Sequence, residues 1–161
     1  MNPIKSEVEC CPKFDPSLWD GKRMEWKNKK FIKDHVWTFL YIPINFGAVM
    51  TRLMGKVKVA NVGVPDWLCL SDSVSPWKMD LYLAVDKDIP GVDSVSMTGA
   101  FIAKVFEGEF KDVGKWMKEF GEYTNSKGLS VKKQFMWYTT CPKCAKKYGK
   151  NYVVFFGQLA K

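Results

Sequence analysis

Long apolar runs and most of the residues that build common enzyme sites are missing from this sequence. The longest apolar segments, around Tyr41 and Val153, have roughly eight residues, whereas a membrane-spanning helix needs about 20. The chain has a single histidine, His35, which leaves little room for histidine-based metal sites or catalytic dyads. It also has no glycine-rich phosphate loop and no serine in a nucleophile-elbow sequence. The familiar enzyme motifs are therefore excluded.

Cysteine is scarce and odd in number, with 5 residues in the chain. The N-terminus lacks the apolar stretch of a secretory signal, so we expect a cytoplasmic protein with reduced thiols. Cys141 and Cys144 are two residues apart, a spacing that fits a turn between strands, one half of a zinc site, or a redox pair. Cys10 and Cys11 could supply the missing zinc ligands. We favour the simple turn, with no metal and no cofactor.

The composition is that of one globular domain, with 47% hydrophobic and 26% charged residues, which excludes a disordered chain. The chain has 25 Lys and Arg against 17 Asp and Glu, a net charge of +8. Such an excess usually forms solvated surfaces, and the alternative is a basic interaction module for a protein or nucleic-acid partner. No helix-turn-helix or RNA-recognition signature is present, so we do not expect nucleic acid as the partner.

Hydrophobic periodicity predicts an N-terminal arm, residues 1–34, followed by one domain, residues 35–161. The arm is polar and proline-containing, and we expect its tryptophans to anchor it. β-branched and aromatic residues predict a strand that ends before Pro43. Apolar residues three and four apart predict a helix from Phe46 to about Lys58, with Asn45 as its N-cap, and a second helix from Phe110 to about Gly121. Further strands are predicted at 67–70, 79–85, 99–107, 133–140 and 152–159, with a polar connector at 71–78.

The order strand, helix, two strands thus occurs twice. This order predicts an α+β fold built from duplicated β-α-β-β units. We expect a mainly antiparallel sheet with two helices on one face and a ligand cleft between the repeats. The oligomeric state is not predicted by the sequence.

Three segments resemble the GyrI-like small-molecule-binding domain: residues 75–85 (SPWKMDLYLAV), 99–113 (GAFIAKVFEGEFKDV) and 134–140 (QFMWYTT). This family includes DNA gyrase inhibitor proteins and the effector domains of multidrug-responsive regulators. The resemblance covers about residues 35–159 and implies a cleft for bulky aromatic or cationic compounds. For a stand-alone member it also implies detoxification by hydrolysis of strained, cyclopropane-type electrophiles. We therefore expect a small-molecule ligand, no membrane partner, and either a binder or a hydrolase.

The family pattern places a glutamate two residues before a tyrosine on the strand that precedes the last connector. Tyr138 matches that tyrosine, but Met136 stands in the glutamate position, and a thioether cannot counter a cation or transfer a proton. Glu107, at a strand-to-helix turn, is the candidate catalytic replacement. Its neighbour Glu109 is more typical of a helix-dipole partner.

Aromatic side chains make up 15% of the chain and could form the walls of a ligand cleft. Alternation along the strand from Phe135 separates Met136 and Tyr138 from Phe135 and Trp137, and the family alignment places the first pair in the cleft. The complete set of candidate ligand-binding residues is Tyr41, Trp67, Trp77, Tyr82, Met136 and Tyr138.

Metal analysis tests the turn interpretation of Cys141 and Cys144. Protein purified without a chelator should contain no stoichiometric zinc, because a structural zinc ion bound by thiolates survives purification. A zinc content of one ion per chain would contradict the interpretation.

Overall fold

The computed structural model describes residues 14–40, 42–139 and 151–160. Tyr41, Cys10, Cys11, Cys141 and Cys144 lie outside the described residues. The elements of the described chain are β1 (Arg23–Phe39), β2 (Ile42–Pro43), α2 (Phe46–Ala60), β3 (Cys69–Ser75), β4 (Lys78–Ala84), β5 (Ser94–Glu107), α3 (Val113–Ser126), β6 (Val131–Tyr138) and β7 (Tyr152–Leu159), with short 3-10 helices η1 (Pro16–Leu18), η2 (Pro65–Trp67) and η3 (Phe110–Asp112). None of the described helices is long and apolar enough to cross a membrane.

The chain divides into two compact units, which we name by their helices. The α2 unit is Glu25–Ala100, and the α3 unit is Met1–Met24 together with Phe101–Lys161. The chain passes from one unit to the other inside β1 and again inside β5.

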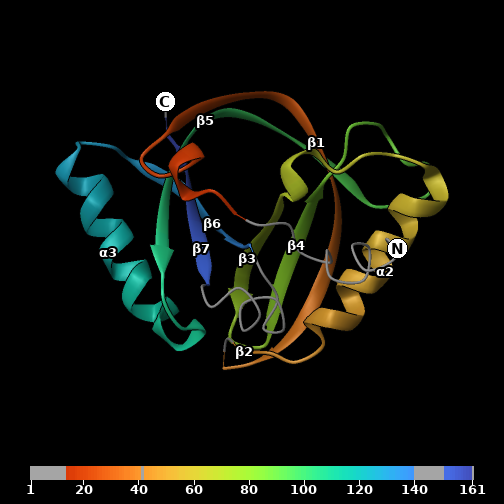
Figure 1. Cartoon of the computed structure of the whole chain (residues 1–161), viewed down its shortest axis with the longest axis horizontal. Coiled ribbons are helices and arrows are strands. Elements are labelled where there is room, and N and C mark those ends of the chain that lie inside the picture. Colours follow the sequence, from red (N-terminus) through yellow and green to blue (C-terminus); the bar gives the residue numbers. More distant parts are fainter. Residues whose placement is uncertain (1–13, 41, 140–150, 161) are drawn as a thin grey trace, which may run out of the picture. The chain divides into compact units, whose positions relative to one another are not determined.

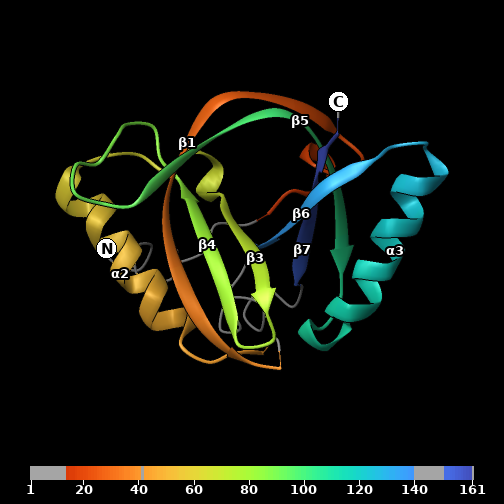
Figure 2. The ribbon, with the colours of Figure 1, turned by 180° about the vertical axis from the view of Figure 1, so that it is seen from behind.

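The α2 unit contains an antiparallel sheet with the strand order β2-β1-β4-β3. Strands β3 and β4 lie side by side and form a hairpin (Figure 2). Helix α2 runs alongside this sheet (Figure 1), and its buried residues Val49, Leu53 and Val57 recur at the four-residue spacing of one helix face. The apolar stripe predicted for this helix is therefore its packing face.

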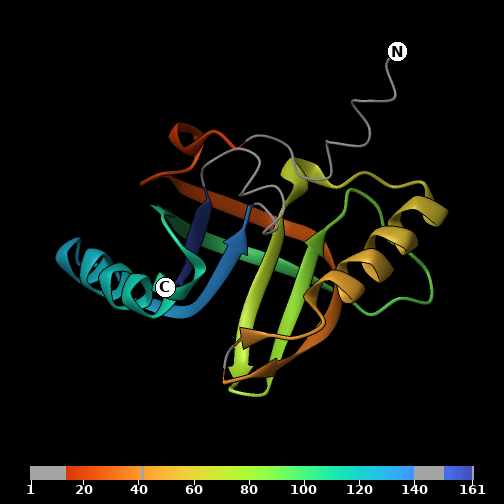
Figure 3. The same cartoon turned by 60° about the horizontal axis from the view of Figure 1, so that its bottom comes forward.

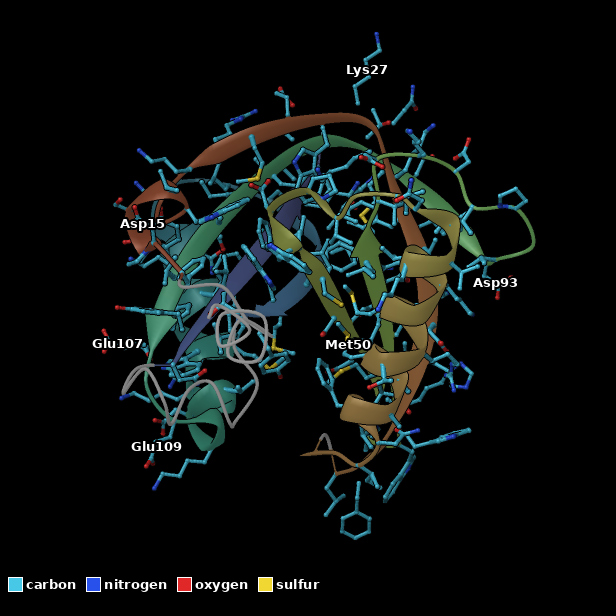
Figure 4. The ribbon with its side chains drawn as sticks, turned by 45° about the vertical axis from the view of Figure 1, so that its right-hand side comes forward. Asp15, Lys27, Met50, Asp93, Glu107 and Glu109 are labelled. Atoms are coloured by element: carbon cyan, nitrogen blue, oxygen red, sulfur yellow. The ribbon has the colours of Figure 1, made fainter. Side chains whose placement is uncertain are left out.

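Alternation along β4 gives the sheet of the α2 unit two different sides. Leu81 is opposite Asp34 of β1, and Asp34 is bound by Arg52 of α2 at 2.7 Å, so Leu81 lies on the α2 side. Figure 4 labels Met50 on the same helix, and its Sδ lies 3.8 Å from the Sγ of Cys69 on β3. The intervening β4 residues Asp80 and Tyr82 consequently point to the side away from α2.

The α3 unit contains an antiparallel sheet with the order β6-β7-β5, and α3 lies alongside it (Figure 1). The ring of Phe120 on α3 lies 5.7 Å from that of Phe155 on β7. The opposite side of the sheet is covered by the chain before β1, where the Trp19 ring lies 5.0 Å from Trp137 and 5.8 Å from Phe156. Trp19 thus anchors the N-terminal segment, as predicted.

The α+β class, the two helices and the antiparallel pairing are confirmed. Both units also have the order strand, helix, two strands, and in each the first strand pairs with the last. A duplication as the origin of this order stays a prediction, as does the division between an arm and a domain at residue 34.

Several predicted boundaries were wrong. β5 begins at Ser94, before the predicted residue 99, and α3 begins at Val113, after the short helix η3 at Phe110–Asp112. β1 begins at Arg23, about twelve residues before the predicted start. The prediction missed this first half because its charged, exposed residues alternate with half-buried ones and resemble an irregular segment in sequence.

The connector predicted at 71–78 is largely strand, because Ser71, Asp72 and Ser73 pair with β4 despite their polar side chains. α3 continues past Gly121 to Ser126, because the helix ends before Gly128, whose φ of 68° only glycine adopts readily.

Gly157 on β7 tests the packing of α3 on its sheet. A Cβ atom there would lie 2.9 Å from Cγ2 of Val131 and 3.1 Å from the Phe120 ring, and neither side chain can move aside easily. We expect Gly157→Ala to lower the free energy of unfolding by about 1–3 kcal/mol in a urea titration.

Gly114→Ala is the control for this prediction. Gly114 lies in α3 with open space around its Cβ position, so the alanine should leave stability unchanged or raise it by about 0.5–1 kcal/mol. Equal unfolding midpoints for Gly157→Ala and the wild type would contradict the packing described for α3.

Candidate functional site

Glu107 and Glu109, the two glutamates considered from sequence, lie in the α3 unit at the end of β5 and just beyond it. Both are exposed and point away from the ribbon (Figure 4). Glu109 binds Lys111 at 3.0 Å, and its role as a helix-dipole partner stays a prediction. A catalytic role for Glu107 stays a prediction, and its exposure leaves it without the apolar surroundings that strengthen acid-base chemistry.

Met136 and Tyr138 lie on the α3 side of their sheet. Met136 is directly opposite Phe155, which packs against Phe120 of α3, and the hydroxyl of Tyr138 lies 3.8 Å from the Met136 Sδ. Burial raises the pKa of Tyr138 to about 12, so its hydroxyl stays protonated at neutral pH. This packing under the helix gives no support to a place for the pair in a ligand cleft.

The remaining described candidates, Trp67, Trp77 and Tyr82, belong to the α2 unit. Trp67 is half-exposed in η2, and Trp77 is half-exposed in the β3–β4 turn, where its ring lies 5.7 Å from Phe39. Tyr82 is buried on β4. Tyr82 is five residues beyond Trp77, about 16 Å along a strand, so these two side chains do not form one contact surface.

Tyr82 has a neighbour that sequence reasoning missed. Asp80 is 8% exposed, and its side chain is about as buried as that of Asp34. It shares with Tyr82 the side of β4 away from α2. The Nζ of Lys33 on β1 lies 3.6 Å from the Asp80 Oδ2 and 5.7 Å from the centre of the Tyr82 ring. Lys33 therefore holds a positive charge between a carboxylate and an aromatic face.

A second carboxylate lies on the same side of the sheet. Asp72 of β3 is directly opposite Asp80 in the hairpin register, which places the Cβ atoms of such a pair about 5 Å apart. We call Lys33, Asp72, Asp80 and Tyr82 the Asp80 cluster. It brings two carboxylates, one ammonium and one phenol ring together, so its formal charge is negative.

The sequence alone could not have revealed this cluster. A regular hairpin with a turn at residues 75–78 would pair Asp72 with Leu81, on the α2 side of the sheet. A bulge between Ser73 and Ser75 shifts the register by one residue and places Asp72 opposite Asp80. The sequence analysis also assigned Asp72 to a connector instead of a strand.

Two adjacent hollows, of about 460 and 270 Å³, lie elsewhere, between the end of α3 and the start of β6. Gly121, Thr124 and Val131 line both, and none of their lining residues is acidic. These hollows lack the charge that would recognise a cation. Among the described residues, no three His, Cys, Asp or Glu side chains are grouped as metal ligands.

Several solved structures have a similar fold. The EcmrR C-terminal domain has a TM-score of 0.66 and 8% identity, covering 89% of this chain and 99% of that chain. SAV2435 bound to tetraphenylphosphonium has a TM-score of 0.52 and 16% identity, and the match covers 88% of this chain and 94% of SAV2435. A hydrolase from Listeria innocua has a TM-score of 0.60 and 13% identity, covering 98% of both chains.

These likenesses are at the level of fold alone. A comparison with curated proteins finds no significant match. The sequence profile of the family described as bacterial hydrolase matches residues 1–159, nearly the whole chain. The chain therefore belongs to the bacterial hydrolase family.

Proposed function

We propose that the protein binds lipophilic aromatic cations at the Asp80 cluster. The observation that carries this proposal is the position of the Lys33 ammonium, between the Asp80 carboxylate and the Tyr82 ring. Carboxylates and aromatic faces are the two groups that recognise organic cations in proteins.

Lys33 marks the position that a ligand's charge would take. A buried carboxylate needs a positive partner, since leaving it unpaired costs several kcal/mol, and Asp80 is almost fully buried. The Lys33 side chain, 39% exposed on a flexible stem, can turn into water while a bound cation replaces it. A ligand's charge would then lie near Asp80 and the Tyr82 ring.

The similarities in fold and sequence support this class of ligand. Tetraphenylphosphonium, the compound bound to SAV2435, is a lipophilic aromatic cation. The GyrI-like resemblance of residues 75–85, which include Asp80 and Tyr82, implies ligands of the same kind. The site proposed here keeps Tyr82 from the sequence-based set and adds the carboxylate that Met136 cannot provide.

Hydrolysis of the bound compound is a second proposal, supported by membership of the bacterial hydrolase family. Asp72 on the strand next to Asp80 is partly buried, so its carboxylate can reach water. We assign Asp72 the role of general base that activates this water. A cyclopropane-type substrate, a role in detoxification and a cytoplasmic location stay predictions.

A matched pair of ligands tests the binding proposal. Methyltriphenylphosphonium and triphenylphosphine oxide share three phenyl rings, but only the first is a cation. By calorimetry, Asp80→Asn should weaken binding of the cation about tenfold or more and that of the neutral oxide less than about twofold, because only the cation loses a charge partner. Equal losses for both ligands would refute the proposed role of Asp80.

Lys33→Met provides the reciprocal control. It removes the competing ammonium, so the cation should bind more tightly and raise the melting temperature more than in the wild type. Binding should also persist at high salt, whereas the alternative function, a basic surface for an anionic partner, predicts affinity for polyanions that salt abolishes.

Hydrolysis is tested with a panel of cationic aromatic esters, epoxides and cyclopropane-type electrophiles, with addition of water detected by mass spectrometry. Asp72→Asn should lower turnover about a hundredfold or more with little change in ligand affinity, as loss of a general base does. Glu107→Gln should leave turnover unchanged. The opposite pattern would return the catalytic role to Glu107 and refute the role of Asp72.

A further inference from the structure

One end of the α2 unit exposes large apolar side chains. It is formed by the end of β1, by β2 and by the β3–β4 turn, which lie together in Figure 3. Six large hydrophobic residues here are more than half exposed: Trp37, Phe39, Leu40, Ile44, Val74 and Trp77. We call these six residues the apolar tip. Only four other large hydrophobic residues of the described chain, Leu18, Val59, Trp67 and Met117, are exposed to a comparable degree.

Folding alone does not explain this concentration. No charged residue occurs between His35 and Arg52, although 26% of the whole chain is charged. Leu40 has a φ of 49°, a left-handed conformation that asparagine and glycine adopt far more readily than leucine. An exposed leucine in a strained conformation contributes nothing to the core, which points to a role outside the fold.

Several polar donors at the apolar tip already have hydrogen-bond partners within the protein. The Trp37 N–H donates to Oδ1 of Asn45 at 2.9 Å, the Ile44 N–H donates to the Trp37 carbonyl at 2.9 Å, and the Thr38 N–H donates to the Trp77 carbonyl at 2.9 Å. The Thr38 hydroxyl donates to the Pro76 carbonyl at 2.8 Å. Because these donors have partners within the protein, an apolar medium would not leave them unsatisfied.

Charge distinguishes between a lipid surface and a second copy of the chain. Helix α2 begins at Phe46 beside the tip and contains no acidic residue, and its Arg52 is bound by Asp34 of β1. Lys78 directly follows Trp77, and Lys56 and Lys58 lie further along α2. These cations are attracted to anionic lipid head groups. Two copies meeting at their tips would bring the same cations together, and each chain has a net charge of +8. Six side chains are also few for a stable protein interface, which uses about 20–30 residues a side.

We propose that the apolar tip docks the protein on anionic membranes. Its tryptophan, phenylalanine, leucine and isoleucine side chains enter the boundary between head groups and acyl chains, and Lys78 beside Trp77 faces the head groups. This inference revises the expectation of no membrane partner, which concerned spanning segments. It does not depend on ligand binding at the Asp80 cluster.

The test is sedimentation of the full-length protein with vesicles of phosphatidylcholine alone or with about one third phosphatidylserine. The wild type should bind the anionic vesicles and bind less as salt rises. The double variant Leu40→Asn with Ile44→Asn should bind about tenfold more weakly, because two apolar side chains are lost from the contact. Leu40→Asn relieves the left-handed strain, so the weaker binding would not come from unfolding.

Val59→Gln is the matched control, since Val59 on α2 is 90% exposed but is not part of the tip. It should bind vesicles as the wild type does. Failure of the wild type to bind anionic vesicles overturns the proposal, and so does equal binding by the double variant. A wild-type dimer in gel filtration that the double variant converts to a monomer, without vesicle binding, would overturn it in favour of self-association.

Discussion

The register of β4 between β1 and β3 is the constraint on which the α2 unit depends. Alternation along β4 commits Met79, Leu81 and Leu83 to the α2 side and leaves Asp80 and Tyr82 on the other. A slip by one residue would bury the Asp80 carboxylate under α2 and expose the apolar side chains. Core packing and the composition of the candidate site are therefore fixed by the same pairing.

That pairing places opposite charges where they stabilise one another. Arg52 binds Asp34 on the α2 side, and Arg52 together with the neighbouring backbone lowers the pKa of the Asp34 carboxyl. Lys33, one residue earlier in β1, points to the other side and reaches Asp80. The two ion pairs differ in how the cation is bound. The Arg52 guanidinium donates two hydrogen bonds to the Asp34 carboxylate, whereas the Lys33 ammonium is a single point charge that a ligand can replace.

Much of the fold could be predicted from the sequence, because its signals are local. The stripe of Phe46, Val49 and Leu53 predicted α2, and the strand predicted at 152–159 has the observed ends of β7, Tyr152 and Leu159. The pairing of β1 with β4 could not be predicted, because it joins residues about fifty positions apart. The polar residues of β3 concealed a strand, since their partners come from the facing strand rather than from nearby sequence.

Less of the candidate site could be predicted from the sequence, for the same reason. Tyr82 was a candidate because of its residue type, but Asp80 becomes notable only when the register brings Lys33 and Asp72 beside it. The most direct test is a crystal structure with methyltriphenylphosphonium bound. We expect the phosphonium near the Asp80 carboxylate and the Tyr82 ring, with the Lys33 ammonium turned into solvent. A ligand bound elsewhere, with the contact between Lys33 and Asp80 intact, would contradict this expectation.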